Sequence, residues 1–141
     1  MLALGAVVVV ASVLPEEKGR AVAWHDLSSQ VGPLRIVRPE ARVFRDRATL
    51  ADYLHRAGAR RAAPSVDFSA RQLLLVSPGP RSSTGYAVGV PSVREHGGDL
   101  TVRVRERTPR LDERVTARVT FPYRLLSLPA GKDVDVDWLG R

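Results

Sequence analysis

The sequence predicts an α+β, mostly β domain: an antiparallel sheet or small β-sandwich of six to seven strands with one amphipathic helix. Short apolar or alternating runs recur from residue 72 to the C-terminal end, turn residues separate them, and one earlier stretch has helical spacing. The 141 residues have the size of one domain and can bury a core without disulfides.

The charge of the chain is basic, with 22 Lys and Arg against 15 Asp and Glu, a net charge of +7. The arginines are spread along the whole chain, and no aromatic series interleaves with them as a base-stacking surface requires. We interpret the charge as a solvated basic surface and expect no nucleic acid as partner. The absence of cysteine excludes disulfides and thiolate metal sites.

The N-terminal segment 1–14 is uncharged and is followed by Pro15 and the charged run 16–18. It is shorter than the roughly 20 residues of a spanning helix, but it matches the apolar centre of a secretory signal, about 7–15 residues long. We therefore expect residues 1–23 to be a signal peptide or an incomplete membrane anchor, residues 24–141 to be a single domain, and the protein to be extracytoplasmic, either secreted or associated with the cell envelope. A buried strand is the alternative, because "AVVVVASV" is rich in β-branched residues.

Residues 24–45 predict a loop with short extended pieces at 34–38 and 41–45, punctuated by glycine and proline. A helix is predicted next, with Asp46 as its N-cap and Gly58 at its end. Its apolar stripe has helical spacing and consists of Leu50, Tyr53, Leu54 and Ala57.

Everything from residue 72 onward reads as strand. The apolar run "QLLLVS" at 72–77 predicts a central strand covered on both faces, and "EHGGD" at 95–99 predicts a hairpin between "YAVGV" and "LTVRVRE". Three further strands are predicted at 114–120, 123–128 and 133–138. In the last, "DVDVDW", the valines and Trp138 should face the core, and the aspartates should face solvent opposite Arg103 and Arg105.

Catalytic motifs are absent from the sequence. It has no G-x-S-x-G, no H-E-x-x-H and no P-loop, and His25, His55 and His96 are each expected at the surface. The acidic run 133–137 does not fit a calcium loop, because Trp138 occupies the position that requires glycine. We expect no enzyme, no cofactor and no metal.

An ordered set of landmarks between residues 66 and 129 resembles the PrcB C-terminal domain family, named after a subunit of a surface protease complex. The landmarks are "VDFS" at 66–69, Gly85 and Tyr86, Gly97 and Gly98, then Val115, Thr116, Thr120, Pro122 and Tyr123. The chain departs from the family at Ser82 and Ser83, where members commonly carry a Pro-Thr-Gly-Gly-Tyr-like loop, and at Ala117, which replaces a glutamine. The resemblance implies a non-catalytic extracytoplasmic protein-binding domain, accessory to a protease or an envelope complex. Its expected partner is a protein, and a protease is one candidate.

The loop between the first two strands of this region is the candidate partner-binding site. It consists of Arg81, Ser82, Ser83, Thr84, Gly85 and Tyr86. Gly85 is expected to supply a special backbone conformation or a close approach, and Tyr86 to anchor the next strand in the core. The structural alternative is a simple turn before a core tyrosine. The functional alternative is a chagasin-like cysteine-protease inhibitor acting through residues 82–86, since its Thr-Gly-Tyr is similar to the loop that such inhibitors insert into a catalytic cleft.

Overall fold

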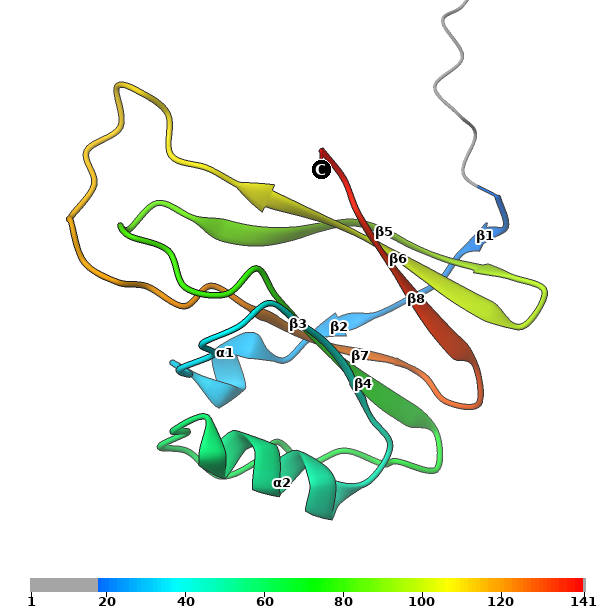
Figure 1. Ribbon diagram of the computed structural model, residues 1–141. Helices are drawn as coiled ribbons and strands as arrows, with labels where there is room; N and C mark the ends of the chain where they lie inside the picture. The colour runs from blue at the N-terminus through cyan, green and yellow to red at the C-terminus, as the bar shows by residue number, and fades with distance from the viewer. Residues whose placement is uncertain (1–17, 141) are drawn as a thin grey trace, which may run out of the picture.

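The computed structural model describes residues 18–140, and this part of the chain forms two four-stranded sheets and two helices (Figure 1). The elements in chain order are β1 (Arg20–Ala21), β2 (His25–Asp26), α1 (Ser28–Val31), β3 (Glu40–Phe44), α2 (Arg47–Arg56), β4 (Arg71–Ser77), β5 (Ala87–His96), β6 (Asp99–Arg107), β7 (Arg124–Pro129) and β8 (Asp133–Trp138). The mostly β, α+β fold class predicted from the sequence is confirmed.

The two sheets and α2 stack as three layers (Figure 1). One sheet, the outer sheet, has the order β1-β5-β6-β8, and the other, the central sheet, has the order β2-β7-β4-β3. One apolar cluster fills the space between the sheets, and a second lies between the central sheet and α2. The central sheet is therefore covered on both faces.

β4 lies inside the central sheet, between β3 and β7. Its side chains alternate between the two apolar clusters: Leu73 and Leu75 face α2, whereas Leu74 and Val76 face the outer sheet. All four are at most 1% exposed. The prediction of a central strand covered on both faces is confirmed, because a continuous apolar run suits a strand with two dry faces.

β5 and β6 form the predicted hairpin, closed by Gly97 and Gly98 with φ of +58° and +87°. Positive φ at both central residues is the geometry of a type I′ turn, which matches the twist of the strands. β5 is longer than predicted because its ladder continues to His96, past a bulge between Gly89 and Ser92.

The strands pair antiparallel, as predicted, except at β8, which pairs with β6 in parallel. The turn after β7 carries the chain from the central sheet to the edge of the outer sheet, where it runs beside β6. The predicted faces hold: Val134, Val136 and Trp138 pack on the cluster between the sheets. Of the two arginines expected opposite the aspartates, Arg103 pairs with Asp137 at 3.5 Å.

The N-terminal half contains the predicted helix and one that was not predicted. Asp46 caps α2 by accepting a hydrogen bond from the backbone N–H of Thr49 at 2.8 Å, as expected. The single turn α1 is additional. Residues 34–38 form no strand, because Leu34 and Ile36 are buried against the α2 cluster instead of pairing with a neighbour.

The apolar segment 1–14 lies outside the described residues. The first described pairing is β1 with β5, which adds residues 20–21 to the outer sheet, and Val22 follows with a backbone hydrogen bond to Val93 at 3.0 Å. Neither helix within residues 18–140 is long and apolar enough to cross a membrane.

Candidate binding surface

The candidate loop 81–86 connects β4 to β5 and is held by the long connection between β6 and β7. We call this connection, residues 108–123, the arm (Figure 1). Arg81 and Thr120 exchange two backbone hydrogen bonds, of 2.9 and 2.8 Å, and form an isolated antiparallel bridge. The loop and the arm are therefore one structural unit, although 39 positions separate Arg81 from Thr120.

The side chain of Arg81 ties the loop to β6. Its guanidinium donates two hydrogen bonds to the carboxylate of Glu106, at 2.7 and 2.8 Å, and both side chains are largely buried. The hydrogen bond to Glu106 raises the pKa of Arg81. A two-pronged Arg–carboxylate contact of this kind fixes orientation as well as position. The Arg81 side chain therefore forms an ion pair within the protein.

Threonine side chains connect the middle of the loop to the arm. The backbone N–H of Thr84 donates to the carbonyl of Thr116 at 3.1 Å, and the hydroxyl of Thr84 accepts from the N–H of Thr116 at 2.9 Å. The hydroxyl of Thr120 donates to the carbonyl of Ser83 at 2.8 Å. Thr84 therefore contacts the arm through its backbone and its hydroxyl, and Ser83 contacts it through its carbonyl.

Gly85 has both properties expected from the sequence. Its φ of +97° lies in the left-handed region, and a Cβ placed there would lie 2.9 Å from a carbon of Pro109 and 3.1 Å from one of Val115. Glu113 also approaches this position and pairs with Arg107, whose hydrogen bond lowers the pKa of Glu113. Any other residue at position 85 would push the arm away.

The prediction that Tyr86 anchors β5 in the core is wrong. Tyr86 lies one residue before β5, is half-buried, and contributes to neither apolar cluster. Its ring lies against Arg81, whose guanidinium carbon is 5.8 Å from the ring centroid. The β5 side chains Val88 and Val93 occupy the core position instead. Ser82 is the exposed residue of the loop, and residues 83–86 are half-buried.

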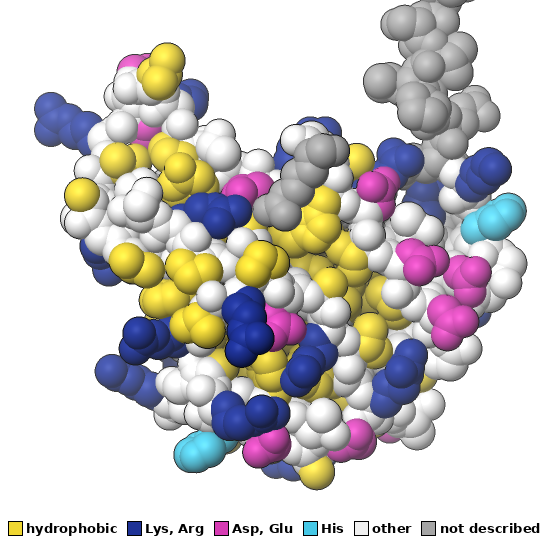
Figure 2. Space-filling view, in the orientation of Figure 1, with side chains coloured by type: hydrophobic (Ala, Val, Ile, Leu, Met, Phe, Trp, Pro, Cys, Tyr) yellow, Lys and Arg dark blue, Asp and Glu magenta, His cyan; other side chains and the backbone are white. Residues whose placement is uncertain are grey.

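The arm also corrects the prediction of a strand at 114–120. This segment forms no ladder within the described residues apart from the bridge at Thr120, because no other strand runs beside it. Three large apolar side chains project from the arm: Leu111 is fully exposed, Val115 is 43% exposed and Val119 is 62% exposed. In Figure 2, hydrophobic side chains gather on the left, where Figure 1 places the arm. The arm therefore presents apolar surface to solvent.

A shallow groove adjoins the base of the arm. It lies at the bulge of β5 and is lined by Gly89, Val90, Pro91, Arg105 and Arg107. Arg107 belongs to both features, because it also donates a hydrogen bond to the carbonyl of Gly85. The groove and the loop are therefore adjacent.

The remaining groups with catalytic potential are dispersed. His25, His55 and His96 are all exposed and lie on β2, α2 and the end of β5. Within residues 18–140, no three His, Asp or Glu side chains are grouped so as to hold a metal ion. The loop and the arm are the described features with the strongest geometric organisation for binding.

Sequence reasoning found the loop and missed the arm. The alternation of valine with arginine and threonine in 114–120 is typical of a half-buried strand, and it concealed an irregular segment. The flanking Pro109 and Pro122 were the signal available, because proline at both ends disfavours a strand that continues its neighbours.

Comparison with known proteins agrees with the resemblance seen in the sequence. The family model described as PrcB C-terminal matches residues 73–129, which extend from β4 through the loop, the hairpin and the arm to the end of β7. Comparisons with curated proteins and with solved structures give no match. The matched region contains the whole candidate surface, and the match supports the PrcB C-terminal family for residues 73–129.

Proposed function

We propose that the protein is a non-catalytic, extracytoplasmic protein-binding domain, accessory to a protease or cell-envelope complex, and that the arm contacts the partner. The observation that carries this proposal is the exposure of Leu111, Val115 and Val119 on one segment. Of the four large apolar side chains exposed among residues 18–140, three lie on the arm. Apolar surface concentrated in this way is typical of protein interaction sites.

The hydrogen bonds between arm and loop support the same function. Because the Thr84–Thr116 contacts and the Arg81–Thr120 bridge order the arm before binding, little conformational entropy is lost when a partner docks. The family supports a role related to a protease complex.

Capture of a partner from envelope extracts tests the proposal, with identification by mass spectrometry. The wild-type domain is compared with a triple variant, Leu111→Ser, Val115→Ser and Val119→Ser, and with Val37→Ser. Val37 is the matched control, because it is 57% exposed and lies outside the arm. We expect wild type and Val37→Ser to retain the same protein and the triple variant to lose it. Equal retention by all three would refute the arm as the contact surface.

An inhibitor that inserts residues 82–86 into a catalytic cleft is the competing function. Insertion would require the loop to separate from the arm, which lies so close that a Cβ added at Gly85 would be 2.9 Å from a carbon of Pro109. We therefore expect papain-like proteases to keep full activity in the presence of micromolar protein. Inhibition that is lost in Gly85→Ala would favour the competing function.

Export is proposed from the uncharged segment 1–14. Residues 1–30, with the coding region upstream of Met1, are fused to a reporter that is active only outside the cytoplasm. An active reporter is expected, and a silent one from a fusion that accumulates in the cell would contradict export.

A further inference from the structure

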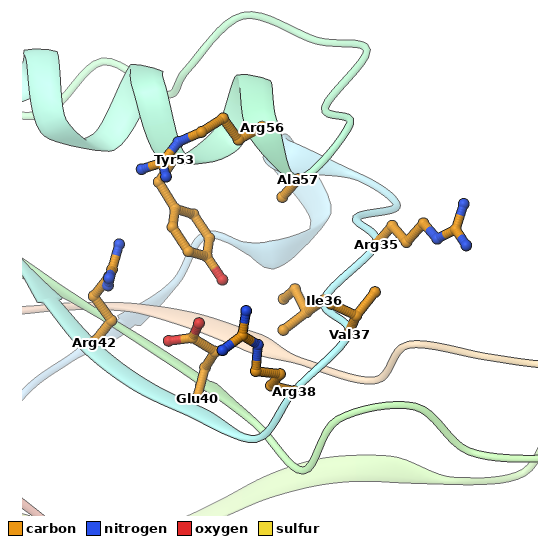
Figure 3. A pocket seen from close by; sticks show the side chains of 9 residues that line it. All are labelled: Arg35, Ile36, Val37, Arg38, Glu40, Arg42, Tyr53, Arg56 and Ala57. Atoms are coloured by element: carbon orange, nitrogen blue, oxygen red, sulfur yellow. The ribbon is translucent and has the colours of Figure 1, made fainter.

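A cavity of about 390 Å³ lies between α2, the segment 35–38 and the start of β3, on the opposite side of the central sheet from the outer sheet (Figure 3). It is lined by Arg35, Ile36, Val37, Arg38, Glu40, Arg42, Tyr53, Arg56 and Ala57. This volume falls within the range of about 300–1,000 Å³ that small-molecule sites occupy.

Tyr53 supplies a hydrogen-bond donor to this cavity. The residue is 8% exposed, and its hydroxyl points from α2 into the cavity, toward Glu40 and Ile36 (Figure 3). Within residues 18–140 the hydroxyl forms no hydrogen bond, and burial raises its pKa, so it remains a proton donor at neutral pH. A hydroxyl that makes no hydrogen bond within the protein and faces an open cavity can donate to an acceptor bound there.

The charge of the lining favours an anion. Four arginines and one glutamate are among the lining residues, a net charge of +3, and Asp52, which pairs with Arg56 at 3.0 Å, reduces it to +2. Arg42 lies over the ring of Tyr53, with its guanidinium carbon 5.2 Å from the ring centroid. Arg35 points outward at the mouth, over the ring of Phe121.

The remaining wall is apolar. Ile36 and Ala57, which are 2% and 8% exposed, border the cavity beside the charged groups, so an organic substituent attached to the anion would lie against them (Figure 3). An inorganic anion would leave this wall in contact with water.

We propose that this cavity binds the phosphoryl group of a small phosphate monoester, with Tyr53, Arg38 and Arg42 as donors and Ile36 and Ala57 against the organic part. A phosphate monoester carries close to two negative charges at neutral pH, which match the net charge of the site. Guanidinium groups suit phosphoryl oxygens because their planar fork donates two parallel hydrogen bonds.

The site favours a dianion over a carboxylate because Glu40 already places one negative charge in the cavity. A monoanionic ligand would leave an excess of positive charge, whereas a dianion compensates it. Removal of the Glu40 charge should therefore tighten binding, and removal of an arginine charge should weaken it.

The test uses the protein with three soluble probes, phenyl phosphate, benzoate and inorganic phosphate, titrated by calorimetry and by NMR. Phenyl phosphate should bind with a dissociation constant of about 0.1–1 mM, as expected for a ligand of roughly ten heavy atoms. Benzoate and inorganic phosphate should bind more weakly, and the NMR shifts should centre on Tyr53 and Arg42. Benzoate binding as tightly as phenyl phosphate would overturn the proposal.

Four variants and one control distinguish the contribution of individual hydrogen-bond donors to binding from that of the protein's net charge. Arg38→Gln and Arg42→Gln should each weaken phenyl phosphate binding about tenfold and Tyr53→Phe about threefold or more, whereas Glu40→Gln should tighten it about threefold. Arg118→Gln is the matched control, because it removes the same charge from the exposed arm. Thermal unfolding of each variant shows whether it retains the fold. Arg38→Gln and Glu40→Gln alter side chains at the cavity rim.

Two outcomes contradict the site. Binding that weakens equally in Arg118→Gln and Arg42→Gln would assign the affinity to net charge alone. The second outcome uses phosphatidylcholine vesicles that contain phosphatidic acid. If the protein sediments with these vesicles but does not bind phenyl phosphate at about 10 mM, well above the expected dissociation constant, the phosphoryl group belongs to a lipid. That result would overturn the small-ester proposal.

Discussion

β4 and the arm meet the same loop, from opposite ends of the PrcB-like region, and they differ in almost every physical property. β4 pairs with strands on both sides and buries residues 72–77 between two apolar clusters. In the arm, every residue from 114 to 119 is exposed. The difference shows that β4 carries the stability of the fold, whereas the arm is held by a few polar contacts and keeps its apolar side chains available to a partner.

The largest effect that separates the two regions is expected from truncation of one apolar side chain in each. Leu74→Ala should lower the free energy of unfolding by about 2–5 kcal/mol, because Leu74 is 1% exposed and a cavity would remain. Val119→Ala should change it by no more than about 0.5 kcal/mol, because Val119 is exposed. Urea unfolding measures both, and a similar loss in the two variants would contradict the comparison.

The junction between loop and arm should respond more weakly than β4 and more strongly than the arm surface. Gly85→Ala should lower the free energy of unfolding by about 1–3 kcal/mol, through strain at positive φ and displacement of the arm. Gly131→Ala is the matched control, because its φ is +77° and nothing lies within 4 Å of the added Cβ. The difference between the variants isolates the arm contact, and equal losses would show that the contact contributes nothing.

Hydrogen exchange locates the effect of this substitution. In Gly85→Ala the amides of Thr84 and Thr116, which bond across the junction, should exchange faster, while β4 amides should keep their protection. Uniformly faster exchange would mean that the substitution acts on the whole fold.

The ion pair between Arg81 and Glu106 should contribute less. Its side chains are 24% and 15% exposed, and the two hydrogen bonds are short, so a double-mutant cycle with Arg81→Gln and Glu106→Gln should give a coupling energy of about 1 kcal/mol. The coupling should fall little with added salt, because the pair is largely buried. A coupling near zero would show that the loop is held by its backbone bonds alone.

The sequence predicted the elements whose structure is determined by a local pattern. It did not predict those whose structure is determined by long-range pairing. β4, α2 and the hairpin were predicted because each is determined by residues that are neighbours in the sequence. β4 is a continuous apolar run, α2 is capped by Asp46, and the hairpin has a Gly-Gly turn. The arm and the parallel β8 were missed because their state depends on which strands lie beside them.

The same distinction applies to the candidate sites. Gly85 could be identified from the loop sequence, since positive φ is a local requirement. Its partners Pro109 and Glu113 are more than 20 positions away, and no local pattern connects them to the loop. The arginine cavity was missed for the same reason, because α2 and the segment 35–38 meet only in the folded chain.

The smallest expected effect is acid loosening of the arm through Glu113. The hydrogen bond from Arg107 lowers the pKa of Glu113 below its ordinary value of 4.5 in the folded protein. A carboxyl whose pKa is lower in the folded state stabilises that state above its unfolded pKa and loses the contribution as the pH falls through the folded pKa. Above about pH 4.5, Glu113 should therefore help to hold the arm over Gly85.

An NMR titration of Glu113 should show a midpoint below 4.5, because the partner Arg107 favours the charged form. Exchange at the amide of Thr116 should be faster in Glu113→Gln than in wild type at neutral pH, and the two proteins should converge as the pH falls below 4.5. Comparison with the variant removes the contribution of other carboxylates, which titrate in both proteins. A midpoint at or above 4.5, or a difference that stays constant with pH, would mean that the loop backbone and Gly85 hold the arm without this ion pair.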